Sequence, residues 1–269
     1  MSKNLILQYY IPYESFDADL GGIDMPDWAK AGSENAQKYA EYCGADYLLL
    51  HDRYFEHLDP RLDSIRMHHD PQFDQYDNVM KMDLDMLCNT NDNIFESFDQ
   101  EADVAMVHEL GVHTGNPAGW LKRVMDVPQY QRGIIAYGKL LFDDKNWMFP
   151  KSKLYPKERF RYMNGGLQLW TKHGRLKARE HFTSIDHYVL HTRYTEQMYV
   201  NLQLSQPIFN VYELDTYWNR MPYQWGNGNW PDGKISHFLA RDKFNMPRLW
   251  EGMKIGKISR DCSWCKTGS

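Results

Sequence analysis

The stretch Asn-Val-Met-Lys-Met-Asp-Leu-Asp-Met-Leu, residues 78–87, surrounds two acidic residues with apolar ones. Its apolar side chains predict a strand that is buried on both faces, as in the parallel part of an α/β sheet. The polar run 88–93 has the composition of a loop, so we expect the strand to end near Asp85. Because side chains alternate along an extended chain, Asp83 and Asp85 should share one face.

Two carboxylates held this close repel each other, and a hard divalent cation relieves that repulsion. Mg²⁺ keeps few protein ligands and takes the rest from water and substrate phosphates. The pair Asp83 and Asp85 therefore predicts a site at which a metal ion binds a nucleotide diphosphate. The alternative is structural: the two carboxylates cap loops or pair with Lys81, and a bare Asp-x-Asp is common.

Composition limits the class of protein. A chain of 269 residues with 42% hydrophobic and 25% charged residues can bury an ordinary core. A net charge of −5 argues against a nucleic-acid partner, and no apolar run approaches the roughly 20 residues of a membrane span. The chain opens directly into a strand, without a signal-peptide cleavage region, and its four cysteines do not resemble a secreted disulfide framework. We therefore expect a soluble, cytoplasmic protein.

The first half alternates between predicted strands and helices. Ser33 is the expected N-cap of one helix and Gly44 its C-terminal stop. The predicted elements are a strand at 5–11, a helix at 33–43, a strand at 46–50, a short helix at 61–69, the strand ending at Asp85 and a strand at 103–108. This β-α-β-α-β order predicts an α/β fold with a mainly parallel central sheet flanked by helices. In such sheets, ligands bind outside the carboxyl ends of the strands, which is where the Asp pair lies.

The second half has a less regular pattern. The predicted elements are a loop and helix at 111–131, a helix at 134–141, two strands joined by a glycine bend at 161–170, a helix at 195–204 and a strand at 209–214. No linker or repeat divides the chain, so we expect one domain, with a nucleotide-binding half at about 1–110 and an acceptor half at about 111–269.

Further candidate residues lie in this half. His237 precedes Lys243 by six residues: an imidazole suits a metal ion and an ammonium suits phosphate, although each could be an ordinary surface residue. Asn164 precedes two glycines, which permit a close backbone approach or only form a tight turn. The pair Glu196-Gln197 begins a helix, where such side chains often face solvent. The lone Cys-x-x-Cys at 262–265 is expected to hold free thiols.

The order of these motifs resembles the GT-A-fold glycosyltransferases, and most closely their glycogenin-like, retaining branch. In that branch, an Asp-x-Asp motif and a late His bind Mn²⁺, and a His-Phe-x-Gly-x-x-Lys-Pro-Trp segment holds the nucleotide diphosphate. This chain has His237, Phe238 and Lys243 at matching spacing. It departs from the pattern with Ala240 in place of Gly and Phe244 in place of Pro, and its Trp is displaced to position 250.

The resemblance implies a single GT-A-type, Rossmann-like domain that binds Mn²⁺ (or Mg²⁺) and a nucleotide diphosphate sugar, with UDP as the expected nucleotide. It implies a glycan or glycoprotein acceptor. It also implies a role for each matching residue: Asp83 near the donor ribose and the metal, Asp85 and His237 as metal ligands, Lys243 on the diphosphate, Asn164, Gly165 and Gly166 beside the donor sugar or the acceptor, and Glu196 and Gln197 facing the donor sugar. Tyr9 and Tyr10 are candidates to contact the base because of their position at the end of the first strand.

Two mechanisms remain open. In an inverting enzyme, Glu196 or Asp186 would deprotonate the acceptor hydroxyl. In a retaining enzyme, Gln197 and Asn164 would stabilise an oxocarbenium-like centre. The segment from His237 to Lys243 favours this retaining outcome. Two other classes also fit part of the pattern. A metal-dependent nucleotidyltransferase or nucleotide-sugar hydrolase could share the Asp pair, and a non-catalytic carbohydrate-binding protein would account for the 9 Trp and 18 Tyr.

Overall fold

The structure is a computed structural model that describes residues 2–11, 24–108, 163–182, 195–204, 206, 208–221, 232–256 and 262–265. The expected helices at 111–131 and 134–141 lie outside these ranges. Among the described residues, no helix combines the length and the apolar composition that a membrane span requires.

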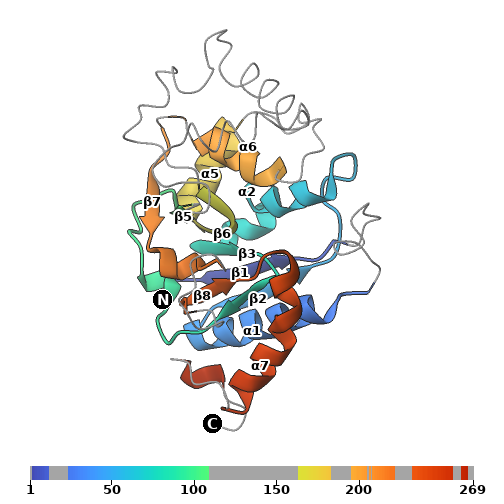
Figure 1. Cartoon of the computed structure of the whole chain (residues 1–269). Coiled ribbons are helices and arrows are strands. Elements are labelled where there is room, and N and C mark those ends of the chain that lie inside the picture. Colours follow the sequence, from blue (N-terminus) through green and yellow to red (C-terminus); the bar gives the residue numbers. More distant parts are fainter. Residues whose placement is uncertain are drawn as a thin grey trace, which may run out of the picture.

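The central feature is a six-stranded sheet in the order β2-β1-β3-β6-β5-β7 (Figure 1). The strands are β1 (Asn4–Tyr9), β2 (Asp46–Leu50), β3 (Asn78–Met82), β5 (Val104–His108), β6 (Met163–Thr171) and β7 (Val211–Leu214). The pairs β1–β2, β1–β3 and β5–β7 are parallel, whereas β6 runs antiparallel to both of its neighbours. The predicted fold class, α/β with a mainly parallel central sheet, is confirmed.

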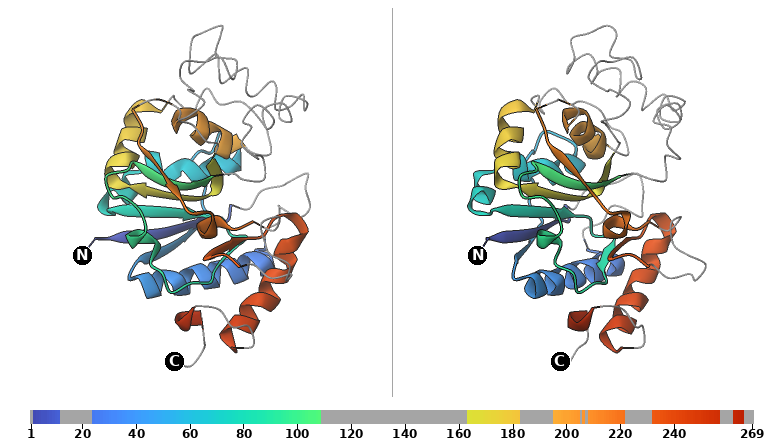
Figure 2. Two further views of the ribbon diagram at one scale, coloured as in Figure 1. Left: turned by 60° about the vertical axis from the view of Figure 1, so that its left-hand side comes forward. Right: turned by 90° about the vertical axis from the view of Figure 1, so that its left-hand side faces the viewer.

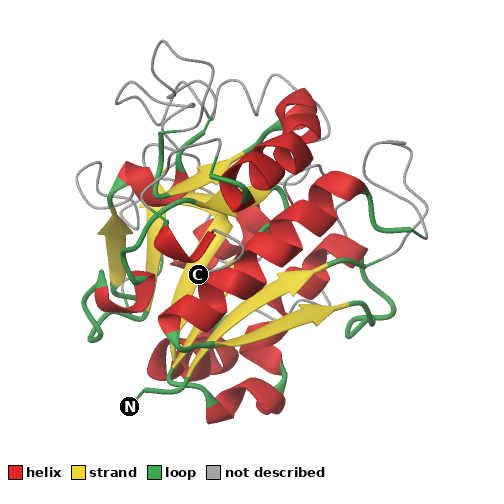
Figure 3. Cartoon of the chain, turned by 90° about the horizontal axis from the view of Figure 1, so that it is seen from below, coloured by secondary structure: helices red, strands yellow, loops and turns green. Residues whose placement is uncertain are grey.

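Helices cover both faces of this sheet. One layer contains α1 (Asp27–Cys43) and α7 (Met246–Lys254), and the other contains α2 (Arg66–His69), α5 (Lys172–His181) and α6 (Thr195–Leu204) (Figures 1 and 2). Figure 3 views the molecule from the α1 side. Alternation along β1 divides its side chains between the two layers: Leu5 and Leu7 pack on the α5–α6 side, and Ile6 packs against α1. Burial of both faces explains why the strands contain apolar runs.

The remaining elements are short. The 3-10 helices are η1 (Pro60–Ile65), η2 (Pro71–Gln75), η3 (Ile94–Glu96), η6 (Thr216–Asn219), η8 (Ala240–Asn245) and η9 (Ser263–Cys265). A second, two-stranded sheet pairs β4 (Met86–Cys88) with β8 (Ile235–His237) in antiparallel orientation.

The predicted start of the first helix was wrong. Helix α1 begins at Asp27, directly after Pro26, so Ser33 lies inside it rather than at its N-cap. Proline suits a position just before a helix, because the missing N–H would have no helical partner there. The hydroxyl of Ser33 instead contacts the Tyr47 hydroxyl at 2.7 Å. The predicted end is confirmed: Gly44 terminates the helix in a left-handed conformation, with a φ of 64°.

The predicted end of the strand near Asp85 was also wrong. β3 ends at Met82, the chain turns at residues 84–85, and β4 joins the second sheet. The turn has a packing reason, because Leu84 lies against α1: a Cβ added to Gly32 would be only 1.9 Å from the Leu84 carbonyl oxygen. The segment at 163–171 differs as well, since it forms one continuous strand. The register of the β5–β6 pairing shifts instead: Met106 of β5 pairs with Gln168, whereas His108 pairs with Met163.

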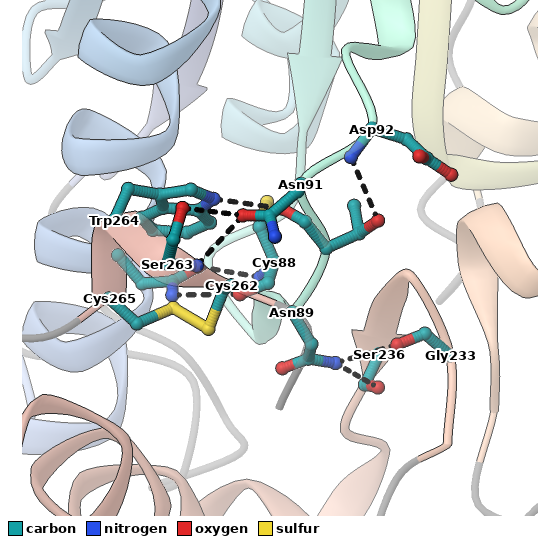
Figure 4. The surroundings of a disulfide bond; sticks show 12 residues. Cys88, Asn89, Asn91, Asp92, Gly233, Ser236, Cys262, Ser263, Trp264 and Cys265 are labelled. Carbon is teal, nitrogen blue, oxygen red and sulfur yellow. Dashed lines mark hydrogen bonds between the residues drawn. A yellow bond between two sulfur atoms is a disulfide. The ribbon is translucent and has the colours of Figure 1, made fainter. Parts of the chain in front are cut away.

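The two tail cysteines form a disulfide, so the expectation of free thiols was wrong (Figure 4). The short helix η9 brings the Cα atoms of Cys262 and Cys265 to 5.4 Å, which lies within the usual disulfide range. Ser263 donates two hydrogen bonds to the Asn91 side chain, and the Trp264 indole donates one to the carbonyl of Thr90. The described part of the tail is thereby held against the loop that follows β4.

Candidate functional site

Asp83 and Asp85 lie in the turn that follows β3, at the carboxyl end of that strand. The backbone N–H of Asp83 donates to the Gly166 carbonyl at 2.8 Å, and Gln8 Nε2 donates to the Asp83 carbonyl at 3.1 Å. These bonds fix the start of the turn between β1 and β6. Both acidic side chains are partly exposed, so they can reach a ligand from solvent.

His237 joins the pair through the second sheet. β8 places His237 opposite Met86 in the β4–β8 ladder, and the N–H of Phe238 donates to the Asp85 carbonyl at 2.7 Å. One ligand atom from each of Asp83, Asp85 and His237 lies within 4.8 Å of the others, and His237 Nε2 is 3.2 Å from Asp85 Oδ1. The structure thus brings together the three residues that the sequence suggested as metal ligands.

Gly166 makes this convergence possible. A Cβ at that position would lie 2.7 Å from His237 Cε1, closer than real Cβ contacts come, and 3.1 Å from Asp83 Oδ2, which is tighter than most of them. Any other residue would push the imidazole and the carboxylate apart. The two glycines therefore allow a close approach within a strand, and they do not form the predicted bend.

Lys81 lies beneath the Asp pair and is buried. Its ammonium donates to Asp83 Oδ1 at 2.6 Å, to the Gly165 carbonyl at 2.8 Å and to Glu196 Oε1 at 3.2 Å. These three acceptors match the three N–H bonds of an ammonium. Burial alone would lower the pKa of Lys81, but the carboxylates of Asp83 and Glu196 raise it above its ordinary value. Lys81 therefore stays charged, and it joins β3, β6 and α6.

Glu196 and Gln197 begin α6 and press against Gly165. Gln197 Oε1 accepts a hydrogen bond from the Gly165 N–H at 2.7 Å, and a Cβ on Gly165 would lie 2.8 Å from Glu196 Oε1. Glu196 also faces Gln168 Nε2 at 3.4 Å. Burial raises the pKa of Glu196, and the Lys81 ammonium opposes that shift.

Asn164 contacts a residue that the sequence did not single out. Its Oδ1 accepts from the Gly166 N–H and from Asn219 Nδ2, both at 2.8 Å. Asn219 is buried, and its Oδ1 lies 3.0 Å from His237 Nδ1. The amide of Asn219 therefore connects the glycine strand to the imidazole.

Lys243 lies on η8, which follows β8, and it is buried. Its ammonium lies 4.5 Å from the centre of the Trp28 ring, at a cation–π distance. A role for Lys243 on a diphosphate stays a prediction.

The hydroxyl groups of the two expected base contacts, Tyr9 and Tyr10, have different surroundings. The Tyr9 hydroxyl is buried, and burial raises the pKa of Tyr9 far above its ordinary value. The Tyr10 hydroxyl donates to the Asp24 carbonyl at 2.8 Å. Their role beside a base stays a prediction. Asp186, the second candidate base, lies outside the described residues.

The donor set of Asp83, Asp85 and His237 fits a divalent cation. Carboxylate oxygens suit Mg²⁺ and Mn²⁺, and an added imidazole shifts the preference toward the transition metal. One ligand atom from each of the three side chains lies within 4.8 Å of the others, a separation that a single ion can bridge. The residues therefore fit Mn²⁺, and Mg²⁺, a chemically harder cation, is the alternative.

No protein-family model and no curated protein matches this sequence. Solved structures do match. A glycosyltransferase involved in the glycosylation of the major capsid of PBCV-1 aligns with a TM-score of 0.52 and 13% identity over 93% of this chain and 98% of its own.

Two further glycosyltransferases align over similar lengths. Mouse xyloside xylosyltransferase 1 has a TM-score of 0.47 and 14% identity over 90% of this chain and 98% of its own. The galactosyltransferase LgtC, in complex with donor and acceptor sugar analogs, has a TM-score of 0.45 and 11% identity over 96% of this chain and 98% of its own. Of these three structures, the first has a TM-score above 0.5. The chain has a GT-A-like fold.

Sequence reasoning overlooked two residues of this site. Lys81 was considered only as a partner that would make the Asp pair structural, yet it contacts Asp83 and Glu196 at once. The signal for it was a lysine inside an otherwise apolar strand, because a buried ammonium requires anionic partners. Asn219 gave no comparable signal, since its importance depends on η6 meeting β8.

Proposed function

We propose that this protein is a metal-dependent glycosyltransferase that moves a sugar from a nucleotide diphosphate sugar, with UDP as the nucleotide, to a glycan or protein-linked acceptor. The observation that carries the proposal is the convergence of Asp83, Asp85 and His237 at the carboxyl end of β3. It supports the resemblance to GT-A transferases, because His237 lies more than 150 residues after the Asp pair and the β4–β8 ladder brings it to them.

Asp83, Asp85 and His237 would hold Mn²⁺ or Mg²⁺. When bound, such a cation supplies Lewis-acid stabilisation of the charge that develops on the departing nucleotide diphosphate. Lys243 would add a positive charge at the diphosphate. Asn164, Gly165 and Gly166 would lie beside the donor sugar, and Tyr9 and Tyr10 would contact the base.

The environment of Glu196 supports a retaining outcome, as in the glycogenin-like branch. Its Oε1 accepts hydrogen bonds from the ammonium of Lys81 and from Gln168 Nε2, so internal donors occupy the oxygen that an acceptor hydroxyl would need. Gln197 offers an amide oxygen, which cannot take a proton readily but can stabilise positive charge at an oxocarbenium-like centre. The oxygen of Asn164 accepts two internal hydrogen bonds, so we assign charge stabilisation to Gln197 and positioning to Asn164.

The decisive experiment incubates the protein with Mn²⁺, a panel of nucleotide sugars and candidate acceptors, and then determines the new linkage by NMR. The proposal expects transfer from a UDP-sugar with the donor's anomeric configuration, and no transfer by the Asp85→Ala variant. A product of opposite configuration would overturn the retaining assignment and make Glu196 or Asp186 the candidate base.

The same panel tests the broader assignment. A nucleotidyltransferase or nucleotide-sugar hydrolase would give a nucleotidyl product or a free sugar instead of a new glycosidic linkage. Thermal stabilisation by free glycans, without stabilisation by any nucleotide plus Mn²⁺, would overturn the transferase proposal in favour of a carbohydrate-binding protein.

A further inference from the structure

We propose that Asn219 is a positioning residue that holds His237 in the one neutral tautomer able to bind a metal ion through Nε2. This inference rests on the proposed function, because it assumes that His237 is a metal ligand. Asn219 does not face the ion. It acts through Nδ1, the opposite side of the imidazole ring.

The chain of hydrogen bonds begins at the Gly166 backbone amide, whose chemistry is unambiguous. A backbone N–H can only donate, so the Asn164 side-chain atom that faces it at 2.8 Å must be the carbonyl oxygen. The Asn219 atom that faces the same oxygen at 2.8 Å must then be the amide nitrogen. The orientation of the Asn219 amide is thereby fixed, although nitrogen and oxygen differ little in shape.

With its nitrogen toward Asn164, Asn219 presents its oxygen to His237 Nδ1 at 3.0 Å. An oxygen of this kind only accepts, so Nδ1 must carry the proton. In a neutral ring the lone pair is then on Nε2, which lies 3.2 Å from Asp85 Oδ1. Without a metal ion that carboxylate favours a proton on Nε2, and the Asn219 oxygen is the acceptor that opposes it. Metal-binding histidines generally donate their other N–H in this way, and such partners tune metal affinity.

The backbone also holds Asn219 in place. Asn219 ends η6, and the next residue, Arg220, forms two backbone hydrogen bonds of 2.9 Å with β8: its N–H donates to Ile235, and its carbonyl accepts from His237. Asn219 is 1% exposed, so water does not replace its contact with the ring. This rigidity is what a positioning role requires.

The test measures Mn²⁺ affinity by electron paramagnetic resonance, without nucleotide, in four proteins: wild type and the Asn219→Leu, Asn219→Asp and Asn78→Ala variants. Asn219→Leu removes the acceptor and should weaken Mn²⁺ binding about 10–100-fold. Asn219→Asp keeps an oxygen toward Nδ1 but loses the N–H that donates to Asn164, so it should recover part of the affinity. Asn78 is a buried amide at the other end of β3 that donates to the Asn4 side chain, so Asn78→Ala controls for the loss of a buried hydrogen bond and should leave Mn²⁺ affinity unchanged.

A second measurement does not require metal. Long-range ¹H–¹⁵N spectra of the metal-free protein, at a pH where histidine is neutral, should place the His237 proton on Nδ1 in the wild type. They should show a loss of this preference in Asn219→Leu. A purely structural role would not change this signature. Circular dichroism and thermal unfolding identify any variant that fails to fold.

Three outcomes would overturn the inference: unchanged Mn²⁺ affinity in Asn219→Leu, equal losses in Asn219→Leu and Asn219→Asp, or a wild-type proton on Nε2. Failure of the proposed function looks different. In that case, the wild-type protein would bind no Mn²⁺, with or without UDP.

Discussion

The ammonium nitrogen of Lys81 lies 2.6 Å from Oδ1 of Asp83, so the first carboxylate of the Asp-x-Asp pair is already bound to a cation of the protein itself. The other oxygen of Asp83, Oδ2, faces the backbone of Gly166 and the imidazole side of the site. Asp83 therefore divides its two oxygens between a structural contact and a candidate metal ion. The contact with Lys81 and the proposed metal contact would therefore use different atoms of one side chain, so the two are compatible.

Replacing Lys81 with Met should destabilise the protein strongly. The substitution leaves Asp83 and Glu196 facing each other without a cation, and breaking a buried ion pair from one side costs up to about 3–5 kcal/mol. Chemical denaturation would measure the loss. The double variant Lys81→Met with Glu196→Gln is the matched control, because it also removes a negative charge and should regain much of the stability. If the double variant is no more stable than the single one, the Lys81–Glu196 contact does not carry the effect.

Asp85→Ala should abolish Mn²⁺-dependent binding of UDP while leaving the fold intact. The side chain of Asp85 is partly exposed and contributes little to the core, but it is one of three candidate metal ligands. Isothermal titration of UDP in the presence of Mn²⁺ would measure the change. Unchanged affinity would mean that the acidic pair serves only the structure.

Gly166→Ala should weaken Mn²⁺ binding, because the new methyl group would overlap His237 Cε1 and force the imidazole away from Asp83. The matched control is Gly44→Ala. A Cβ there meets no neighbour within 4 Å, but the left-handed backbone makes it cost about 1–2 kcal/mol of stability. Only the first variant should lose metal affinity. Equal metal affinity in the two variants would contradict the close packing argued for Gly166.

Lys243→Ala should weaken UDP binding even when Mn²⁺ is saturating, whereas His237→Ala should act by weakening the dependence on metal. The two residues have different chemistries and lie on successive elements, β8 and η8. UDP titrations at several Mn²⁺ concentrations would separate the effects. If Lys243→Ala leaves UDP affinity unchanged, the ammonium serves contacts within the protein, such as the one with Trp28, rather than the diphosphate.

Asp74→Asn should lower stability at neutral pH by up to about 1 kcal/mol, since Asp74 forms a two-point, partly exposed ion pair with Arg179. Hydrogen bonds from Arg179 lower the pKa of Asp74 below its ordinary 3.8. A lowered carboxyl pKa contributes stability that is fully present above the unfolded value and lost as the pH falls through the folded value. The difference between wild type and variant should therefore vanish in strong acid, as measured by urea unfolding across pH. A difference that persists there would exclude the ion pair as its cause.

Much of the fold could be predicted because the pattern of residues is local. Apolar runs and the Gly44 stop indicated β1, α1, β2 and β3, and their order indicated parallel pairing. The break after Met82 could not be predicted, because its cause is a contact with Gly32 of α1. The antiparallel direction of β6 depends on residues that lie far away in sequence, so no local pattern indicates it.

The candidate site shows the same division. Asp83, Asp85 and His237 have side chains whose chemistry points to a metal ion, and the structure brings them together. Asn219 has no such chemistry of its own. Its place in the site follows from two backbone hydrogen bonds between Arg220 and β8, which can be seen only in three dimensions.

The pairing of β4 with β8 has a consequence for how the protein is made. His237 meets Asp85 only when this two-stranded sheet forms, and β8 is synthesised long after β3. Under the proposed function, the turn that follows β3 therefore emerges from the ribosome as an incomplete site, without its third metal ligand. Stabilisation by the complete site would then begin only after β8 has been made.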